Sequence, residues 1–132
     1  MRLVLCNGVF DLLHAGHIAH LSEARKMGDF LVVGLTLDDY VNKPGRPIQK
    51  WDERATILGA LKAVNTVFPC RDAVDAILEW KPTLFVKGGD YLDKGLLDEE
   101  IEACRKVGAR ITHTKYVPVT TTDIVRRIKE AA

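Results

Sequence analysis

The chain has 132 residues, of which 47% are hydrophobic, and this length fits one domain, residues 1–132, with a buried core. Its 19 Lys and Arg residues and 18 Asp and Glu residues give a formal net charge of +1, which argues against nucleic acid as a partner. Cys6, Cys70 and Cys104 are far apart, so we expect reduced thiols in a cytoplasmic protein. We expect neither a signal peptide nor a membrane-spanning segment.

The first half of the chain alternates apolar strands with amphipathic helices. We predict a strand over 2–6, a helix over 17–27 that Gly28 ends, and a strand over 30–36 whose continuous apolar run suits a sheet covered on both faces. Residues 37–50 contain two prolines around Gly45 and are predicted to form a loop. Asp52 is expected to cap a helix that runs to about residue 63.

The second half continues the alternation. We predict strands over 66–68, 84–87 and 109–114, and helices over 72–80, 97–107 and 121–131. This order predicts an α/β fold, a parallel sheet with helices on both faces, whose ligands bind at the carboxyl ends of the strands. Four polar segments follow predicted strands, namely 8–17, 37–46, 87–91 and 115–122, so they are expected to meet at one edge of the sheet.

Two histidines at the start of the first helix suggest the chemistry. His14 and His17 flank Gly16, which would let a phosphate approach the backbone closely. The first amides of a helix lack backbone partners and attract anions. Imidazoles beside them can stabilise the charge that develops in nucleotidyl transfer, so we predict a nucleoside triphosphate as substrate. The alternatives are a capping or packing pair, or a zinc site extended to His20 with no cysteine nearby.

Acidic and basic residues of the predicted edge are assigned to phosphate binding or to loop structure. Asp11 either orders its loop by accepting backbone amides, which we favour, or approaches magnesium, and it is also a candidate residue at the substrate phosphate. Lys43 and Arg46, in the proline-restrained loop, are candidates to hold the phosphate of an acceptor, with solvated charges as the alternative. Arg54 is interpreted as a phosphate clamp or a surface salt-bridge partner.

The last two polar segments are candidates for nucleotide binding. Lys87, Gly88, Gly89 and Asp90 leave a strand, where glycines permit a base or ribose to lie against the backbone; an ordinary turn is the alternative. The hydroxyls of Thr120, Thr121 and Thr122 can cap the last helix and bind phosphate, and capping alone would account for one of them. Lys115 adds a positive charge to the second of these segments.

These motifs resemble those of a known family. Gly8-Val9-Phe10-Asp11 followed by His14-Ala15-Gly16-His17 is similar to the G-x-F-D…H-x-G-H pattern of the cytidylyltransferase-like nucleotidyltransferases. Segments 43–47, 59–61, 86–91 and 120–122, with Arg54, resemble the adenylyltransferase domain of ADP-heptose synthase. The chain is also similar to the glycerol-3-phosphate cytidylyltransferases.

The resemblance implies a five-stranded Rossmann-like sheet of order 3-2-1-4-5, Mg²⁺ bound with the triphosphate, and a homodimer. It implies that His14 and His17 stabilise the transition state, that Lys43 holds substrate or α-phosphate, and that Gly8, Val9, Phe10, Gly16 and the threonines contact the nucleotide. The reaction expected is transfer of a nucleoside monophosphate to a phosphorylated sugar or polyol with release of pyrophosphate. ATP is the favoured donor and CTP the second choice.

The sequence departs from the family's pattern near the end of the chain. Lys115, Pro118 and Thr120 stand where the family has an arginine, a glycine and a serine. Lysine keeps the charge without the bidentate fork, and proline removes a backbone N–H. This departure keeps open a nucleotide-binding module without catalysis, while the fold leaves open an adenylyltransferase that acts on a vitamin phosphate.

Overall fold

The computed structural model describes residues 1–89, 96–115 and 117–132. The strands are β1 (Leu3–Gly8), β2 (Phe30–Thr36), β3 (Thr66–Cys70), β4 (Leu84–Lys87) and β5 (Arg110–His113). The helices are α1 (Ala15–Arg25), α2 (Trp51–Gly59), α3 (Ala73–Trp80), α5 (Asp98–Val107) and α6 (Thr121–Ala131), with a short 3-10 helix η1 (Asp38–Tyr40).

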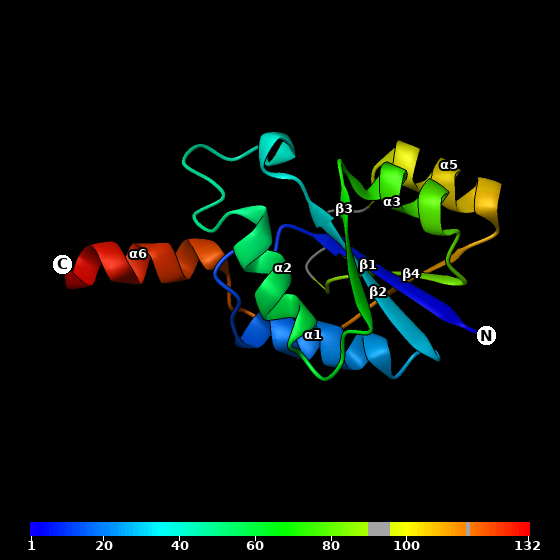
Figure 1. Ribbon diagram of the computed structural model, residues 1–132, viewed down its shortest axis with the longest axis horizontal. Helices are drawn as coiled ribbons and strands as arrows, with labels where there is room; N and C mark the ends of the chain where they lie inside the picture. Colours follow the sequence, from blue (N-terminus) through cyan, green and yellow to red (C-terminus); the bar gives the residue numbers. More distant parts are fainter. Residues whose placement is uncertain (90–95, 116) are drawn as a thin grey trace.

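The five strands form one parallel sheet of order β3-β2-β1-β4-β5. Helices α1 and α2 lie on one side of it and α3 and α5 on the other (Figure 1). The predicted α/β class, strand order and two-sided covering are therefore confirmed. The chain reverses its direction of winding between β1 and β4, and such a switch point opens a crevice at the carboxyl ends of the strands.

Several predicted boundaries were wrong by a few residues. Strand β1 extends to Gly8 because Asn7 and Gly8 pair with β2. Helix α1 begins at Ala15 rather than 17, because the His14 side chain caps it. The capping role expected of Asp52 is wrong, since Lys50 occupies the N-cap of α2.

Two other elements differ in length from the prediction. Helix α2 ends at Gly59, where it was expected to reach about residue 63. Strand β3 runs on from the predicted 66–68 to Cys70. It includes Pro69, which an edge strand tolerates because one side of that strand has no ladder to donate to.

The side chains of each strand divide between two cores. Val4 and Cys6 of β1 face Leu21 of α1 and Leu58 of α2. Leu5, between them, faces the second core, where Ala76 and Ile77 of α3 and Ala103 and Cys104 of α5 pack. This alternation is the two-residue period of a strand whose faces are both covered, and it fixes the carboxyl ends of the strands as a rigid platform.

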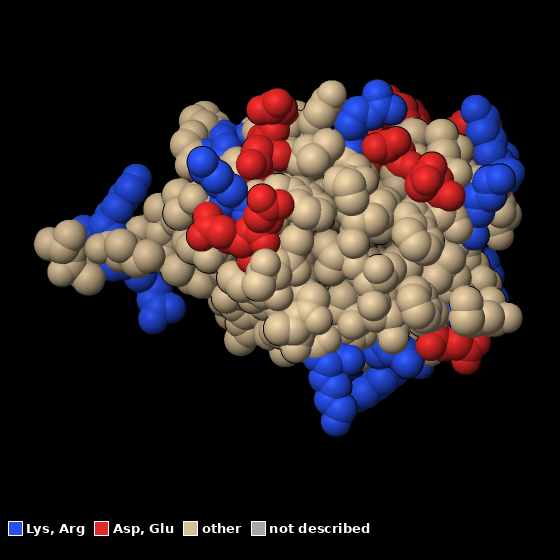
Figure 2. All heavy atoms as spheres, in the orientation of Figure 1, with Lys and Arg blue, Asp and Glu red and all other residues tan. Residues whose placement is uncertain are grey.

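Helix α6 stands apart from this packing. It projects from the body of the molecule (Figure 1), contains no buried residue, and leaves Ile128 60% exposed. Basic side chains mark the projecting helix in Figure 2, and it carries Arg126, Arg127 and Lys129. None of the helices in the described ranges has the length and apolarity that a membrane crossing requires.

The close approach of the chain at Gly28 generates a test of the packing. A Cβ on Gly28 would lie 2.6 Å from Val4 Cγ2 and 2.8 Å from the Arg2 carbonyl oxygen, whereas a Cβ on Gly59 would meet nothing within 4 Å. We expect Gly28→Ala to lower the free energy of unfolding by roughly 1–3 kcal/mol through overpacking. The control Gly59→Ala should raise it by up to about 1 kcal/mol through helix propensity. Equal urea midpoints for the two variants would contradict this packing.

Candidate active site

A cleft of about 720 Å³ opens at the carboxyl ends of the strands and is lined by all four predicted segments. The predicted site residues that line it are Gly8, Val9, Phe10, Asp11, His14, Gly16, His17, Lys43, Arg46, Gly88, Gly89, Lys115, Thr120, Thr121 and Thr122. The amino ends of helices α1 and α6 both belong to its wall. A cleft between two helix N-termini is suited to an anion, because the unpaired amides and the helix dipoles attract negative charge.

His14 and His17 form a reciprocal capping box at the start of α1. The Nδ1 atom of His14 accepts the backbone N–H of Gly16 at 3.1 Å and of His17 at 3.4 Å. The Nδ1 atom of His17 accepts the backbone N–H of His14 at 3.3 Å. The capping alternative is thus correct as a description of Nδ1. It leaves the other ring nitrogen of each histidine for a different task.

The same hydrogen bonds assign the protonation state of the two rings. A ring nitrogen that accepts an N–H carries no proton, so each neutral imidazole has its hydrogen on Nε2. The rings are stacked with centroids 3.7 Å apart. Burial lowers the pKa of His14, and burial together with the neighbouring His14 and His20 lowers the pKa of His17 to about 3. Both rings are therefore neutral Nε2–H donors at physiological pH.

The Nε2 atom of His14 is buried and has no hydrogen-bond partner among the described residues. A buried N–H without an acceptor is unfavourable, and such groups in native proteins usually have a functional reason. A ligand oxygen in the cleft would supply the acceptor.

Gly16 is required for a reason the sequence did not reveal. A Cβ at this position would lie 2.9 Å from Cε1 of the His14 ring and 3.1 Å from the Val119 carbonyl oxygen. The glycine therefore makes room for the capping ring and for the segment before α6. Phe10, expected to contact nucleotide, is 7% exposed, belongs to the core, and packs edge-on against His17 with centroids 5.3 Å apart.

Asp11 has the structural role that the sequence favoured, although its partners lie in another segment. Its carboxylate accepts the N–H groups of Ile48 at 2.7 Å and of Gln49 at 3.0 Å. The side chain is 3% exposed. The expectation that Asp11 binds the substrate phosphate is therefore wrong, because its buried carboxylate is negatively charged and already accepts two amides.

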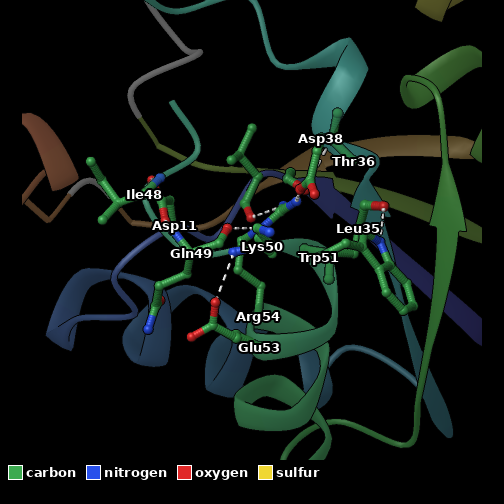
Figure 3. Close-up of polar contacts among 12 residues, drawn as sticks. Asp11, Leu35, Thr36, Asp38, Ile48, Gln49, Lys50, Trp51, Glu53 and Arg54 are labelled. Carbon is green, nitrogen blue, oxygen red and sulfur yellow. Dashed lines mark hydrogen bonds and ion pairs between the residues drawn. The ribbon is translucent and has the colours of Figure 1, made fainter. Parts of the chain in front are cut away.

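Arg54 is a salt-bridge partner, as one alternative expected, but it is buried rather than at the surface, and its buried guanidinium is occupied and cannot clamp a phosphate. It is 1% exposed, and its guanidinium donates from Nε to Gln49 O (3.0 Å) and through its other nitrogens to Val9 O (2.8 Å) and Asp38 Oδ1 (2.5 Å). Figure 3 shows the Arg54 side chain reaching from α2 toward Asp38 and Gln49. Arg54 therefore links three segments by hydrogen bonds: the turn after β1, η1 and the residues before α2.

The cations that do reach the cleft are Lys43, Arg46 and Lys115. Lys43 is exposed, and Arg46 reaches across to α6, where a guanidinium nitrogen lies 3.5 Å from the Thr122 hydroxyl. The backbone N–H of Lys115 donates to Glu23 at 2.7 Å, which fixes its position beside α1. These side chains, from the loop after β2 and from the segment before α6, give the cleft positive charge although the net charge of the chain is +1.

Lys87 departs from the nucleotide-binding role predicted for it. Its side chain is 7% exposed and its Nζ lies 3.5 Å from Oε1 of Glu100 in α5, on the side of the sheet away from α1. Its carbonyl instead accepts the N–H of Thr114 at 2.9 Å. Gly88 and Gly89 line the cleft as expected. Asp90 lies outside the described residues.

The three threonines have three different hydroxyl partners. Thr120 is the N-cap of α6 and accepts the N–H of Asp123 at 3.0 Å. Thr121 donates to the Asp11 carbonyl at 2.7 Å, and Thr122 accepts from Arg46. Capping accounts for one threonine, as expected, and the second ties α6 to the β1 turn.

Sequence reasoning missed the residues that hold the loops. Gln49 accepts the N–H of Leu12 at 3.1 Å through its side chain, and Asp38 pairs with Arg54. His20, considered as a zinc ligand, has its Nδ1 2.7 Å from the Thr114 hydroxyl. Asp38 and Gln49 sit in the polar stretch predicted as loop, and no spacing distinguished them from its solvated residues.

Comparison with known proteins agrees with this geometry. A family model described as cytidylyltransferase-like matches residues 5–127, which confirms the resemblance seen in the motifs. The protein called bifunctional protein HldE of Pelobacter propionicus is 38% identical over 135 residues, and so is that of Aliarcobacter butzleri; each match covers 98% of this chain and 27% of the relative. The chain thus spans about a quarter of the length of these relatives.

A solved structure gives the same picture of the fold. The crystal structure of a lipopolysaccharide core biosynthesis protein from Thermoplasma volcanium superimposes with a TM-score of 0.75 at 30% identity. The match covers 89% of this chain and 98% of that protein. Nearly the whole of that protein therefore has the same fold as this chain.

The lowered pKa of His17 generates a prediction for pH. The folded state holds this pKa at about 3, whereas an unfolded chain has the ordinary value near 6.5. Between these values the unfolded chain binds more protons, so the contribution to stability is full above about pH 6.5 and is lost as the pH falls toward 3. His17→Asn keeps an acceptor for the His14 N–H and does not titrate. Between about pH 7 and pH 4, we expect the free energy of unfolding to fall more steeply with pH in the wild type than in His17→Asn. Urea denaturation at a series of pH values measures this, and equal pH dependence in the two proteins would contradict it.

Proposed function

The chain belongs to the cytidylyltransferase-like family, and from this premise we propose that it transfers a nucleoside monophosphate from a nucleoside triphosphate to a phosphorylated sugar or polyol, with release of pyrophosphate. Family membership supports the reaction class of a nucleotidyltransferase. The acceptor and the donor base are proposals of this article, since the chain spans 27% of the HldE protein it matches.

The observation that carries the proposal is the pair of neutral imidazoles at one of two facing helix N-termini. In nucleotidyl transfer the acceptor phosphate attacks the α-phosphorus and pyrophosphate leaves in line, so the protein mainly positions the phosphates and stabilises developing charge. The Nε2–H groups of His14 and His17 donate toward that charge while their Nδ1 atoms stay fixed on the backbone. Fixed donors stabilise a transition state without reorganising.

The remaining cleft residues divide the phosphates between them. We assign the β- and γ-phosphates to the backbone amides at the α6 N-terminus, Thr121 included, and to the hydroxyls of Thr120 and Thr122, since the Thr121 hydroxyl donates to Asp11. We assign the acceptor phosphate to Lys43 and Arg46 of the opposite wall. Lys115 adds charge near the first group. Mg²⁺ enters as the counter-ion of the triphosphate, because the Asp11 carboxylate already accepts two amides.

We also propose a cytoplasmic homodimer. The three cysteines are buried free thiols, as suits a reducing compartment. The apolar side chain of Ile128 is exposed on the projecting α6, and that of Ile48 is exposed beside it. Apolar groups exposed together are typical of an association surface.

The donor and acceptor are tested by measuring pyrophosphate release from ATP, CTP, GTP and UTP with Mg²⁺ and a panel of sugar and polyol phosphates. We expect turnover with ATP to exceed turnover with CTP, because the segment after β4 resembles the heptose-type adenylyltransferases. Greater turnover with CTP would replace the donor but keep the reaction class. Nucleotide binding without pyrophosphate release from any pair would favour the non-catalytic module.

His14→Asn separates the capping and catalytic roles of His14. Asparagine is among the best N-caps, so the melting temperature should stay near that of the wild type, while loss of the Nε2 donor should lower kcat by roughly 10²–10³-fold. His14→Ala should lose kcat similarly and, in addition, about 0.5–2 kcal/mol of stability with the cap. If His14→Asn turned over normally, the histidine would be a cap alone.

A further inference from the structure

The turn between β1 and α1 has an unusual backbone. Phe10 and Leu12 adopt φ values of +50° and +48°, the left-handed region that side chains with a Cβ disfavour. Leu12 lies two residues before His14, so its conformation sets the direction in which the chain enters the capping box. Backbone of this kind persists where surrounding contacts hold it in place, and it is concentrated at functional sites.

Gln49 makes the contact that holds Leu12. Its side-chain oxygen accepts the Leu12 N–H at 3.1 Å, and its own N–H donates to the Asp11 carboxylate at 3.0 Å. Gln49 therefore clasps the turn through two neighbouring residues: it accepts from Leu12, 37 positions away, and donates to Asp11, 38 positions away. Figure 3 shows Gln49 beside Asp11, between that turn and α2.

Gln49 is itself held from the other side. Its carbonyl accepts Nε of Arg54 at 3.0 Å, and Arg54 is fully buried in the wall behind the cleft. The backbone N–H and C=O of Gln49 are thus both hydrogen-bonded, and this fixes the position from which its side-chain oxygen accepts the Leu12 N–H. A fixed acceptor of this kind can impose a conformation on a turn, which a mobile surface glutamine cannot do.

We propose that Gln49 is a positioning residue for nucleotidyl transfer: its amide oxygen holds the turn at Leu12 and thereby sets the His14 ring toward the reacting phosphate. The proposal rests on the proposed function for its rate effect. The hydrogen bond itself is independent of substrate. Small displacements of a catalytic donor are costly to rate, so the effect of losing this bond should be seen in kcat.

The test compares variants at residue 49 that keep or lose the acceptor. Gln49→Met matches the side chain in length and has no strong acceptor, and Gln49→Asn keeps the amide but withdraws it from Leu12. Both variants should lower kcat by roughly tenfold or more, with little change in KM for the phosphorylated substrate. Gln49→Glu offers a carboxylate oxygen at the same reach and should recover most of kcat.

Asn65→Leu is the matched control. The Asn65 side-chain oxygen accepts the Leu31 N–H at 2.8 Å at the other end of the sheet, so its loss removes the same kind of bond away from the cleft. This variant should lose stability with an unchanged kcat. The melting temperature of every variant is measured beside its kinetics, which are taken well below the lowest melting temperature.

A second readout does not depend on catalysis. NMR of the imidazole nitrogens should show a shifted His14 signal in Gln49→Met and Gln49→Asn, with faster hydrogen exchange at the Leu12 amide, and wild-type values in Gln49→Glu and Asn65→Leu. Absence of wild-type turnover with every substrate pair would refute the proposed function, whereas the His14 signal would still decide the clasp. The inference is overturned if His14 is unchanged in the variants that lose the acceptor, or if those variants keep wild-type kcat.

Discussion

The buried guanidinium of Arg54 joins the turn after β1 to the segment after β2. Burying a cation is unfavourable unless it is paired and hydrogen-bonded, and each of its three nitrogens has a partner, in Asp38, Val9 and Gln49. These partners belong to η1, to the β1 turn and to the residues just before α2. Removing the guanidinium would leave two backbone carbonyls without a donor and Asp38 without its counter-ion, so the loops depend on this side chain as a unit.

The rigidity that Arg54 provides is transmitted toward the cleft through Asp11. Its carboxylate binds the 48–49 backbone, and its carbonyl accepts the Thr121 hydroxyl at the start of α6. The segment with the histidines, the segment with Lys43 and Arg46, and the amino end of α6 are thereby connected by hydrogen bonds. Electrostatic stabilisation of a transition state requires such donors and cations to be placed before the substrate arrives. Asp11 thus orders the walls of the cleft through hydrogen bonds of its carboxylate and its carbonyl.

Sequence could predict the sheet and the location of the cleft because both follow from local patterns. Apolar runs set the strands, their alternation with helices set a parallel sheet, and that topology placed His14, Lys43, Gly88 and Thr121 at one edge. The clasp of Gln49 on Leu12 was not predictable, because it joins residues 37 apart with no pattern in either. Arg54 and Lys87 were misassigned for a related reason: composition favours exposure of a cation, and only tertiary contacts with Asp38 and Glu100 show that each is buried and paired.

In the motif His14-Ala15-Gly16-His17, one nitrogen of each ring meets a folding requirement, and the proposed reaction uses the other nitrogen. A capping box needs acceptors at the N-cap and three residues later, which sets the spacing of the two histidines. The His14 ring and the Val119 carbonyl exclude a Cβ at position 16, which sets the glycine. Serine and glutamate would cap a helix in the same way, so capping by itself does not explain imidazoles. What imidazole adds is a second nitrogen, which carries the proton because the first accepts backbone N–H groups, and in the proposed reaction this second nitrogen is the hydrogen-bond donor to the phosphates.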